Sequence, residues 1–549
     1  MPDAVVAKLS IDGRSLSIDD IAKVALGGIH VQLTEDAVRN MRASVTLKKD
    51  LVAGGQAIYG VTTGFGDSVI RQIEPAKAAE LQRNLVRYHV NGTGPQATAE
   101  VVRATMLIRA NCLARGSSGI RPAVVHLLLD LLNNDVLPLI PERGSVGASG
   151  DLVPLCHLSS ALVGEGLVTY GGEVRATADV MAELALSPVE LQAKEGLALI
   201  NGTSFSSAFA ALATARAAIL CRVAESCTAL AVEALVGNRG HFSEFIHNAK
   251  PHPGQIASAA AVFEQLSGST HALDHEQVLH LNTTLDSRGY AELPRPIQDR
   301  YSLRCAPHVI GVLRDTLAWV RPWVEVEVNS SNDNPLFDSS TGRVHSGGNF
   351  YGGHIAQAMD SLKVALASTA DLLDRQMEHV VDEKFNRGLP PNLVPWFEPD
   401  EWRAGLHHGF KGMQIAASAI TAEALKNSAP ASVFSRSTEA HNQDKVSMSA
   451  IAARDARTVV ELVEEVAAIH LLALCQAIDL RGFEGCAPAT REVHRRVRAV
   501  VPQVRDDRAM EQDIHLVLDL IRSGLLTSPL PAAEGTPSLS EAGGLLPAR

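Results

Sequence analysis

The chain has 549 residues, of which 46% are hydrophobic and 20% are charged, and its formal net charge is −12. A chain of this length and composition can bury large hydrophobic cores and form more than one domain. Because it is acidic, it lacks the basic footprint of nucleic-acid-binding proteins, and no nucleic-acid partner is expected.

Seven cysteines are present, and none of them form a CxxC pair. An odd number without metal-ligand spacing argues against a disulfide framework or a zinc site and predicts a reducing compartment. The first thirty residues carry Asp3, Lys8 and Asp12 among other charges, so they contain no signal-peptide core. No apolar run of about 18 residues without charge is found, so no membrane span is expected. We therefore predict a cytoplasmic protein with no metal and no membrane contact.

Residues 1–210 alternate short segments with glycine-rich connections, which predicts a smaller N-terminal domain of mixed structure. In the connection "GSVGASGD" (144–151), three glycines fall within seven positions. Only glycine adopts positive φ without steric cost, so this stretch requires an unusual backbone. Two interpretations are open here. Ser149 or Asp151 caps the following helix, or the glycines clear space for backbone chemistry.

From about residue 211 the sequence becomes Ala-rich and apolar at helical spacing, and the segments 354–385 and 452–480 repeat this pattern. Long apolar-faced helices predict an extended bundle with a C-terminal helical cap over 211–525. The basic run 491–498 is expected to be a solvated helix face. Strand signals are few, such as "VEVEVNSS" (324–331), and residues 526–549 are expected to form a flexible tail. The predicted fold class is mainly α.

Several polar, Asn-rich junctions lie between these helices: "NSSNDNPLF" (329–337), "HSGGNFYGGH" (345–354) and "TEAHNQDKVSM" (438–448). One such junction is explained by turns and helix caps. Several around one bundle favour a shared polar site.

Together these motifs carry a resemblance. The stretch 144–166, "IYGVTTGFG" (58–66), "KEGLALINGTS" (194–204), "QDRYSLRCAPHVIG" (298–311) and the three junctions resemble, in order, the motifs of the aromatic amino acid ammonia-lyases and aminomutases. The resemblance covers roughly residues 15–520. It implies an ammonia-lyase/fumarase-like fold.

The resemblance also implies a prosthetic group made from the chain itself. Ala148, Ser149 and Gly150 would cyclise, with the Gly150 nitrogen attacking the Ala148 carbonyl, and Ser149 would then lose its hydroxyl. The product is 4-methylideneimidazol-5-one (MIO), an electrophile, and no external cofactor is implied. Covalent catalysis of this kind divides a difficult ammonia elimination into easier steps. Whether the substrate amine or its ring adds to the group stays open.

Further roles follow from the resemblance. Tyr59 would be the base that removes the β-proton, and because a phenol has a pKa near 10, the tyrosinate would need nearby donors or positive charge. The flanking Gly60, Gly64 and Gly66 would suit a mobile lid. Asp151 could assist cyclisation.

The remaining site residues would bind the substrate. Arg304 would hold the substrate carboxylate in a bidentate pair. The resemblance implies that Tyr301 is a catalytic residue. Tyr301 and Gln298 would face the same cavity as Arg304 if their segment is helical. Asn201 and Asn334 would donate to the prosthetic group or the carboxylate, and Phe350 would wall the pocket.

Two motifs bear on the identity of the substrate ring. Tyr88-His89 would face it, and a His at the second position is shared by tyrosine-acting members and histidine lyases. Gln443 stands where histidine lyases typically carry Glu, and His441 resembles the phenylalanine-lyase form of the motif. We therefore expect L-tyrosine, converted to 4-coumarate, with L-phenylalanine as a further substrate. Tyr88 is bulkier than the Ser that often precedes this His.

Three hypotheses stay open at this stage. The first is an ammonia-lyase for tyrosine, with histidine ammonia-lyase as its variant. The second is a tyrosine or phenylalanine 2,3-aminomutase. The third is a catalytically silent scaffold, which the presence of Tyr59 and the Ala148-Ser149-Gly150 triad argues against. The family builds each site from three subunits, so a homotetramer with shared active sites is expected.

Overall fold

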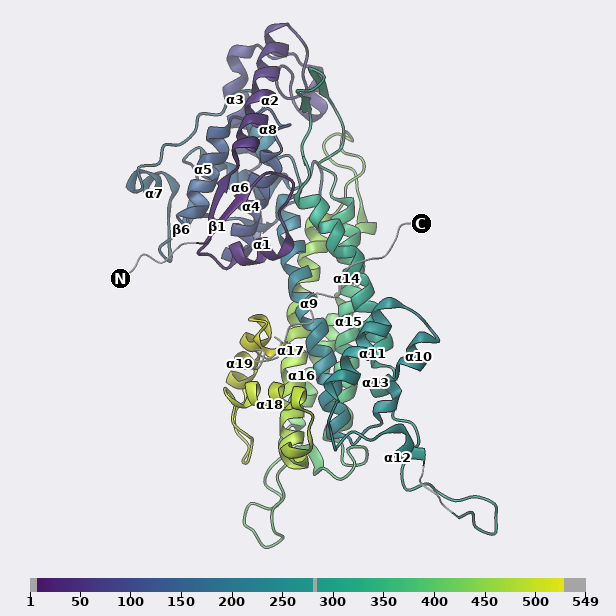
Figure 1. Cartoon of the computed structure of the whole chain (residues 1–549). Coiled ribbons are helices and arrows are strands. Elements are labelled where there is room, and N and C mark those ends of the chain that lie inside the picture. Colours follow the sequence, from purple (N-terminus) through teal and green to yellow (C-terminus); the bar gives the residue numbers. More distant parts are fainter. Residues whose placement is uncertain (1–6, 280–283, 528–549) are drawn as a thin grey trace, which may run out of the picture.

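The structure is a computed structural model that describes residues 7–279 and 284–527. Its N-terminal part consists of short helices and small sheets, at the top of Figure 1. The strands β1 (Lys8–Ile11) and β2 (His30–Leu33) pair in parallel, with Lys8 opposite His30. Two further antiparallel sheets are formed by β3 (Thr93–Gln96) with β5 (Pro141–Arg143), and by β4 (Leu137–Pro138), β6 (Leu167–Tyr170) and β7 (Glu173–Ala176).

The helices of this part begin at side chains that satisfy the free backbone donors of a first turn. Ser17 and Asp20 form a capping box at α1, and Thr34 and Thr98 cap α2 and α4. The helices are α1 (Ile18–Ala25), α2 (Glu35–Ala53), η1 (Gly66–Ile70), η2 (Pro75–Lys77), α3 (Ala78–Tyr88), α4 (Ala99–Ala114), α5 (Pro122–Asn133), α6 (Leu152–Leu162), α7 (Thr177–Glu183) and α8 (Glu195–Ile200).

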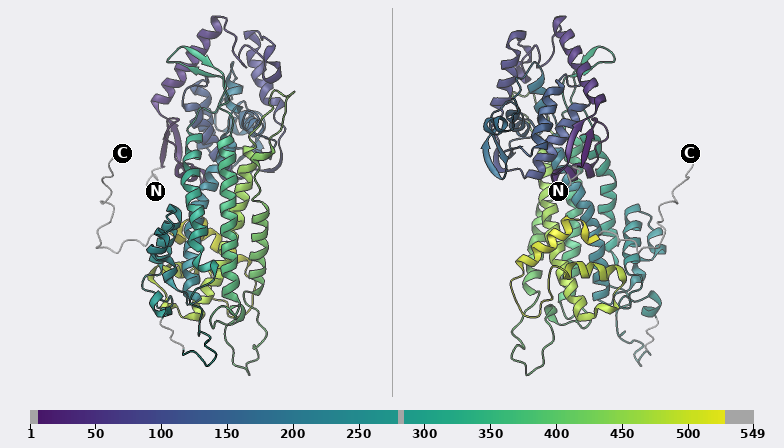
Figure 2. Two further views of the ribbon diagram at one scale, coloured as in Figure 1. Left: turned by 90° about the vertical axis from the view of Figure 1, so that its right-hand side faces the viewer. Right: turned by 60° about the vertical axis from the view of Figure 1, so that its left-hand side comes forward.

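Long helices run side by side below this part and form the bundle (Figures 1 and 2). They are α9 (Ser204–Ala234), α14 (Ala306–Val328), α15 (Gly353–Val381), α16 (Lys411–Lys426) and α17 (Ser449–Arg481). α17 packs against both α15 and α9, so the three segments expected to be long helices share one core. The expected change of texture at residue 211 lies within the first turns of α9.

Among the described residues, α9 is the one helix long and apolar enough to cross a membrane by length and composition. Of its most apolar window, 67% is buried inside the protein. A helix at the centre of a bundle must be apolar on most of its circumference, which accounts for this composition.

Smaller elements flank the bundle. On one side lie η3 (Arg239–Phe242), α10 (Glu244–Asn248), α11 (Pro253–Gln265), α12 (His275–Leu279) and α13 (Tyr301–Arg304). On the other lie η6 (Phe483–Gly485), α18 (Pro488–Arg498), α19 (Glu511–Arg522) and η7 (Leu525–Thr527). The hairpin β8 (Leu336–Asp338) and β9 (Arg343–His345) and the turns η4 (Pro391–Leu393) and η5 (Ser432–Phe434) complete the fold. The basic run 491–498 is helical, as expected. Beyond residue 527, the expected tail lies outside the described residues.

The strand expected in "VEVEVNSS" is wrong, because residues up to Val328 belong to α14. Val320, Val324 and Val328 are fully buried, whereas Val326 is exposed. Residues four apart share a helix face, so the alternating pattern also satisfies the helical period. Burial of that face decides in favour of the helix.

Candidate active site

The loop between β5 and α6 contains the Ala148-Ser149-Gly150 triad in a strained turn. Ser149 has φ 54° and Gly150 has φ 81°, both in the left-handed region. The Gly150 N–H donates to the Gly147 carbonyl at 3.4 Å and closes the turn. A Cβ at Gly150 would stand 2.2 Å from the Gly202 carbonyl oxygen, so only glycine fits here. Cyclisation of this tripeptide requires a bent backbone and an unhindered amide nitrogen at Gly150.

Asp151 lies buried beneath the turn. Its Oδ2 accepts hydrogen bonds from the backbone N–H of Ser206 at 2.7 Å and from the Ser206 hydroxyl at 2.9 Å. Its Oδ1 has no partner within the described part of the chain. Burial raises the pKa of Asp151 to about 6. Asp151 stands at the N-cap position of α6 but does not cap it with its side chain, and Ser149 does not cap it either. The expected N-cap position of Asp151 is therefore confirmed, but no side-chain hydrogen bond caps the helix.

A cavity of about 420 Å³ opens above the triad. Six residues expected in the site line it: Tyr59, Tyr88, His89, Ala148, Ser149 and Asn201. Three more do so from beyond the first bundle helix: Asn334, Phe350 and Gln443. The fold thus brings together residues from seven separate segments of the sequence.

Tyr59, the residue expected to act as the base, lines this cavity. Its hydroxyl accepts a hydrogen bond of 2.9 Å from the backbone N–H of Gly66, on its own glycine-rich loop. Burial raises the pKa of Tyr59, the Gly66 hydrogen bond opposes this, and the Glu439 carboxylate adds to the rise. The Gly66 N–H is thus one of the nearby donors expected for the tyrosinate. The net shift of the Tyr59 pKa is nevertheless upward.

The protonation of His89 follows from its contacts. Its Nδ1 lies 2.9 Å from the Leu85 carbonyl oxygen, which can only accept, so Nδ1 carries a proton. Burial lowers the pKa of His89, so the ring is neutral near pH 7 and its Nε2 is an acceptor. The Tyr88 ring lies against it, with ring centroids 4.3 Å apart, and Tyr88 is 57% exposed. His89 can thus accept a hydrogen bond from a substrate ring.

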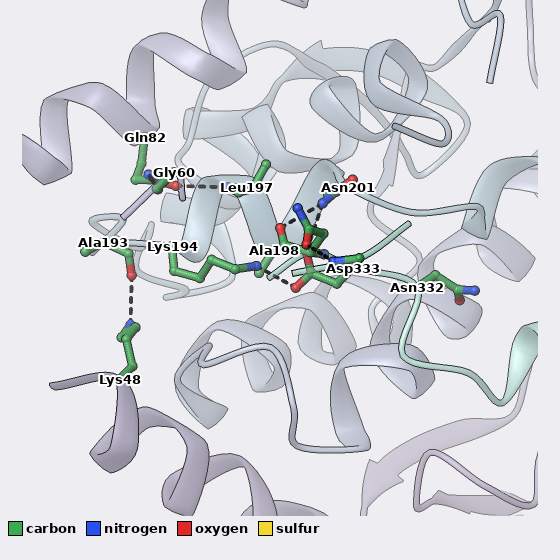
Figure 3. A network of polar contacts seen from close by, with 12 residues as sticks. Lys48, Gly60, Gln82, Ala193, Lys194, Leu197, Ala198, Asn201, Asn332 and Asp333 are labelled. Atoms are coloured by element: carbon green, nitrogen blue, oxygen red, sulfur yellow. Dashed lines mark hydrogen bonds and ion pairs between the residues drawn. The ribbon is translucent and has the colours of Figure 1, made fainter. Parts of the chain in front are cut away.

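Asn201 is held by a buried network that includes Lys194 and Asp333 (Figure 3). Asn201 Nδ2 donates to Asp333 Oδ1 at 3.2 Å and to the Asn334 carbonyl oxygen at 3.0 Å. Lys194 Nζ pairs with Asp333 Oδ2 at 2.6 Å, and both side chains are fully buried. Because both Asn201 donor bonds are already made, Asn201 presents a buried acceptor, Oδ1, without a partner among the described residues.

Asn334 uses its side-chain carbonyl internally. Its Oδ1 accepts from the Gly347 N–H at 2.8 Å. This leaves the Nδ2 group as its donor for a ligand. Of the two asparagines expected to donate in the site, Asn334 is therefore the one arranged to do so.

A left-handed turn presents Gln443 to the triad. Glu439, Ala440 and His441 all have positive φ, between 51° and 65°. Thr438 and Gln443 close the turn through a pair of backbone hydrogen bonds of 3.0 and 3.3 Å. Gln443 Nε2 then donates to Ser149 Oγ at 3.2 Å. Consecutive non-glycine residues with positive φ are costly, and such strain persists where the surrounding contacts fix it. His441 bonds to Ser437 and does not line the cavity.

Glu439 also lines this cavity, and the sequence analysis missed it. Its Oε1 accepts from the Asp67 N–H at 2.9 Å and so joins the Tyr59 loop to the left-handed turn. The only signal for Glu439 in the sequence is its place within "TEAHNQDKVSM", two residues before His441.

Gln298, Tyr301 and Arg304 do not join this cavity. They line a separate cavity of about 600 Å³ together with Leu235 at the far end of α9. α9 has 31 residues, so the two cavities lie roughly 46 Å apart along the bundle at about 1.5 Å per residue. Tyr301 and Arg304 belong to the short helix α13, and Gln298 precedes it. One chain by itself therefore cannot bring both groups to one substrate.

The comparisons with known proteins agree with this geometry. The sequence profile described as "Aromatic amino acid lyase" matches residues 16–499. The chain belongs to this family. A histidine ammonia-lyase of Gloeobacter violaceus is 40% identical over 527 residues, which cover 96% of this chain and 98% of that protein. A protein of Streptomyces globisporus named "MIO-dependent tyrosine 2,3-aminomutase" is 39% identical over 524 residues, covering 94% and 96% of the two chains.

The solved structures give the same result for the fold of this aromatic amino acid lyase. The crystal structure of the tyrosine aminomutase from Streptomyces globisporus superposes with a TM-score of 0.88 at 38% identity. The match covers 95% of this chain and 98% of that one. The expected fold class is confirmed, as is an enzyme of the carbon–nitrogen lyase class. No group of three or more His, Cys, Asp or Glu side chains able to hold a metal ion occurs in residues 7–279 and 284–527.

Proposed function

We propose that this lyase removes ammonia from an aromatic L-α-amino acid, L-tyrosine in the first place, at an MIO group formed from Ala148-Ser149-Gly150. The observation that carries the proposal is the strained glycine turn at the base of a cavity lined by Tyr59. MIO would supply an electrophilic carbon at the position of Ser149. Asp151 Oδ1 is buried and has no partner among the residues that the structure describes. This supports formation of the group, because a carboxyl of raised pKa beside the turn can take and return protons.

Within the cavity, the Tyr59 oxygen takes the proton from the substrate β-carbon. The Gly66 N–H donates to this oxygen and stabilises the negative charge that the tyrosinate carries. The Tyr59 loop is joined to the opposite loop through Glu439, and a joined pair of loops keeps water out of the cavity.

The tyrosine ring is favoured by two neutral side chains. His89 Nε2 accepts a hydrogen bond from the substrate phenol, since its Nδ1 is occupied. Gln443 is uncharged, so an imidazole ring gains no ionic partner there. Together they favour a hydroxyphenyl ring over a phenyl or imidazole ring.

Two other functions have specific support. Most of the similar curated proteins are histidine ammonia-lyases, so the relatives favour histidine over tyrosine. The His89 acceptor is also compatible with an imidazole N–H. The tyrosine-acting relative is a 2,3-aminomutase, which favours return of the ammonia to the β-carbon.

We further propose a homotetramer in which Gln298, Tyr301 and Arg304 come from another copy of the chain. The separation of the two cavities supports this, as do exposed apolar side chains along α14, including Val312, Trp323 and Val326. Obligate interfaces resemble a domain core cut in half. All seven cysteines are free, which supports a reducing, cytoplasmic location.

The deciding experiment is incubation of the purified protein with tyrosine, phenylalanine and histidine separately. Ultraviolet spectra distinguish coumarate, cinnamate and urocanate, and chromatography detects a β-amino acid. We expect the largest kcat/KM with tyrosine. Urocanate as the main product would replace tyrosine by histidine, and β-tyrosine as the main product would establish the aminomutase. No turnover of any of the three would refute the proposal.

A further inference from the structure

A single buried carboxylate marks the point where the chain returns to the bundle before Arg304. Between residues 284 and 302, all of which the structure describes, Asp299 is the only buried side chain, at 6% exposure. The residues before it are irregular and face solvent. Asp299 therefore anchors this segment, five positions ahead of the residue assigned to the substrate carboxylate.

The anchor joins three elements. Asp299 Oδ2 accepts from the backbone N–H of Asn238, just beyond α9, at 2.7 Å. Oδ1 accepts from the Arg387 guanidinium, just beyond α15, at 2.6 Å. The Asp299 backbone N–H donates to His241 Nε2 at 3.2 Å. Together these three contacts fix both the position and the orientation of the backbone at Asp299.

A carboxylate is an unusual choice at this place. The carboxyl end of a helix carries partial negative charge, which disfavours another negative group. Arg387 compensates, since it contacts Asp299 and also the Val236 carbonyl oxygen at the end of α9. Burial acts to raise the pKa of Asp299, but the hydrogen bond that the Asn238 N–H donates and the charge of Arg387 hold it below its usual value. Asp299 is therefore ionised at neutral pH.

The helix that follows depends on such anchors. α13 spans only Tyr301–Arg304 and has no side-chain cap, and so short a helix is not stable by itself. Gln376 on α15 holds it from the bundle side, because its Nε2 donates to the Ser302 carbonyl oxygen at 2.9 Å. Arg304 in turn bonds to the Gln298 side chain and lies over the Tyr301 ring, 4.6 Å from its centroid.

We propose that Asp299 is a positioning residue for substrate binding. It holds the segment from Gln298 to Arg304 in one register, so that the Arg304 guanidinium meets the substrate carboxylate in a single orientation. Bidentate recognition depends on this orientation, and a preorganised donor binds more tightly than a mobile one. The inference rests on the proposed function, in which Arg304 binds the amino acid carboxylate.

The first test compares Asp299→Asn with Asp286→Asn in the full-length, assembled protein. Asparagine keeps an acceptor for the Asn238 N–H but removes the charge that holds Arg387. Asp286 is a matched control, because it is an acid on the same irregular segment whose ion pair with Arg288 is solvent-exposed. We expect Asp299→Asn to raise KM for the amino acid about tenfold with kcat within about threefold, and Asp286→Asn to change neither.

The second test separates positioning from general damage. Two competitive inhibitors are compared: the acrylate product of the accepted amino acid, which carries the carboxylate, and the decarboxylated amine with the same ring. Asp299→Asn should weaken the binding of the acrylate and leave the binding of the amine unchanged. In an Arg304→Ala background it should have no further effect on the dissociation constant of the acrylate, measured by calorimetry, because residues that act through one contact are not additive.

The outcomes are distinguishable. A wild-type protein without turnover of any aromatic amino acid would refute the proposed function itself. An active wild type with an unchanged KM in Asp299→Asn, or equal weakening of both inhibitors, would overturn the positioning role alone. Should Asp299→Asn not assemble, Arg387→Lys tests the same anchor, because lysine keeps the charge but lacks the fork that reaches both Asp299 and Val236. It should reproduce the selective loss of acrylate binding, and unchanged acrylate binding would overturn the inference.

Discussion

The side-chain amide of Gln443 donates a hydrogen bond of 3.2 Å to the Ser149 hydroxyl, across 294 positions of sequence. The contact places an uncharged group beside the residue whose hydroxyl would be lost on MIO formation. It also fixes the left-handed turn 439–441 over the triad. The character of residue 443 therefore bears on both the prosthetic group and the substrate ring.

Ser149→Ala should abolish turnover without unfolding the protein. Turnover should be lost because Ser149 alone supplies the carbon that becomes the methylidene. Intact-mass analysis should find the wild-type chain lighter by two waters and the variant not. Circular dichroism should be the same for both. A wild-type chain of unmodified mass with full activity would remove the basis for the prosthetic group.

Tyr59→Phe should keep the two-water mass loss but reduce kcat about 10²–10⁴-fold, the range of general-base contributions. Because burial raises the pKa of Tyr59 above its usual value of 10.0, the reactive tyrosinate is scarce at neutral pH. In the wild type, kcat/KM should therefore rise by about tenfold per pH unit into the alkaline range.

The substrate amine also titrates in this range, so Tyr59→Phe is the control for its contribution. The difference between the two pH profiles reports Tyr59. Profiles of equal slope, or a near-normal rate in the variant, would mean that another residue takes the proton.

Substitutions of His89 and Gln443 should each change the substrate preference, toward a different amino acid in each case. His89 is half-buried in the single chain. If bound substrate closes the site over it, an acceptor left unpaired there costs about 1–3 kcal/mol, so tyrosine should exceed phenylalanine in kcat/KM by roughly 5- to 150-fold. His89→Phe should shift the ratio toward phenylalanine. Gln443→Glu should improve histidine relative to tyrosine, because it adds a carboxylate near the ring. Unchanged ratios of kcat/KM between the substrates would mean that His89 and Gln443 line the pocket without selecting the substrate ring. The tyrosine proposal would then lose its main support.

Lys194→Met should destabilise the fold strongly. The Lys194–Asp333 pair is fully buried, and removal of one partner from a buried ion pair typically costs about 3–5 kcal/mol. The midpoint of urea denaturation should fall accordingly, and activity should fall too, because Asp333 also binds Asn201. Arg39→Met, which breaks an exposed ion pair with Asp36, is the control and should hardly move the midpoint. An unchanged midpoint in Lys194→Met would contradict this account.

Mixed assemblies should restore activity. Ser149→Ala and Arg304→Ala are each expected to be inactive as pure proteins. Co-expression should yield tetramers in which some sites combine an intact triad from one copy with an intact Arg304 from another. Light scattering should show tetramers throughout. An active monomer, or mixed tetramers without activity, would refute the shared site.

The sequence by itself determined the helices and the triad. Apolar residues at helical spacing predict the long segments around α9, α15 and α17, because a helix face must repeat every 3.6 residues to be buried. The glycines around Ser149 predict an unusual turn, since positive φ excludes most side chains. These are local properties, and neighbouring residues suffice to specify them.

Only the tertiary structure decided the rest. "VEVEVNSS" fits both a strand and a helix until burial selects one face. The upward shift of the Tyr59 pKa depends on its burial and on the charge of Glu439. Both result from the packing of segments that are distant in sequence. Most of all, the fold brings Gln443 to Ser149 while it holds Arg304 at the opposite end of α9, because packing between distant segments, and not spacing along the chain, sets the distance between side chains.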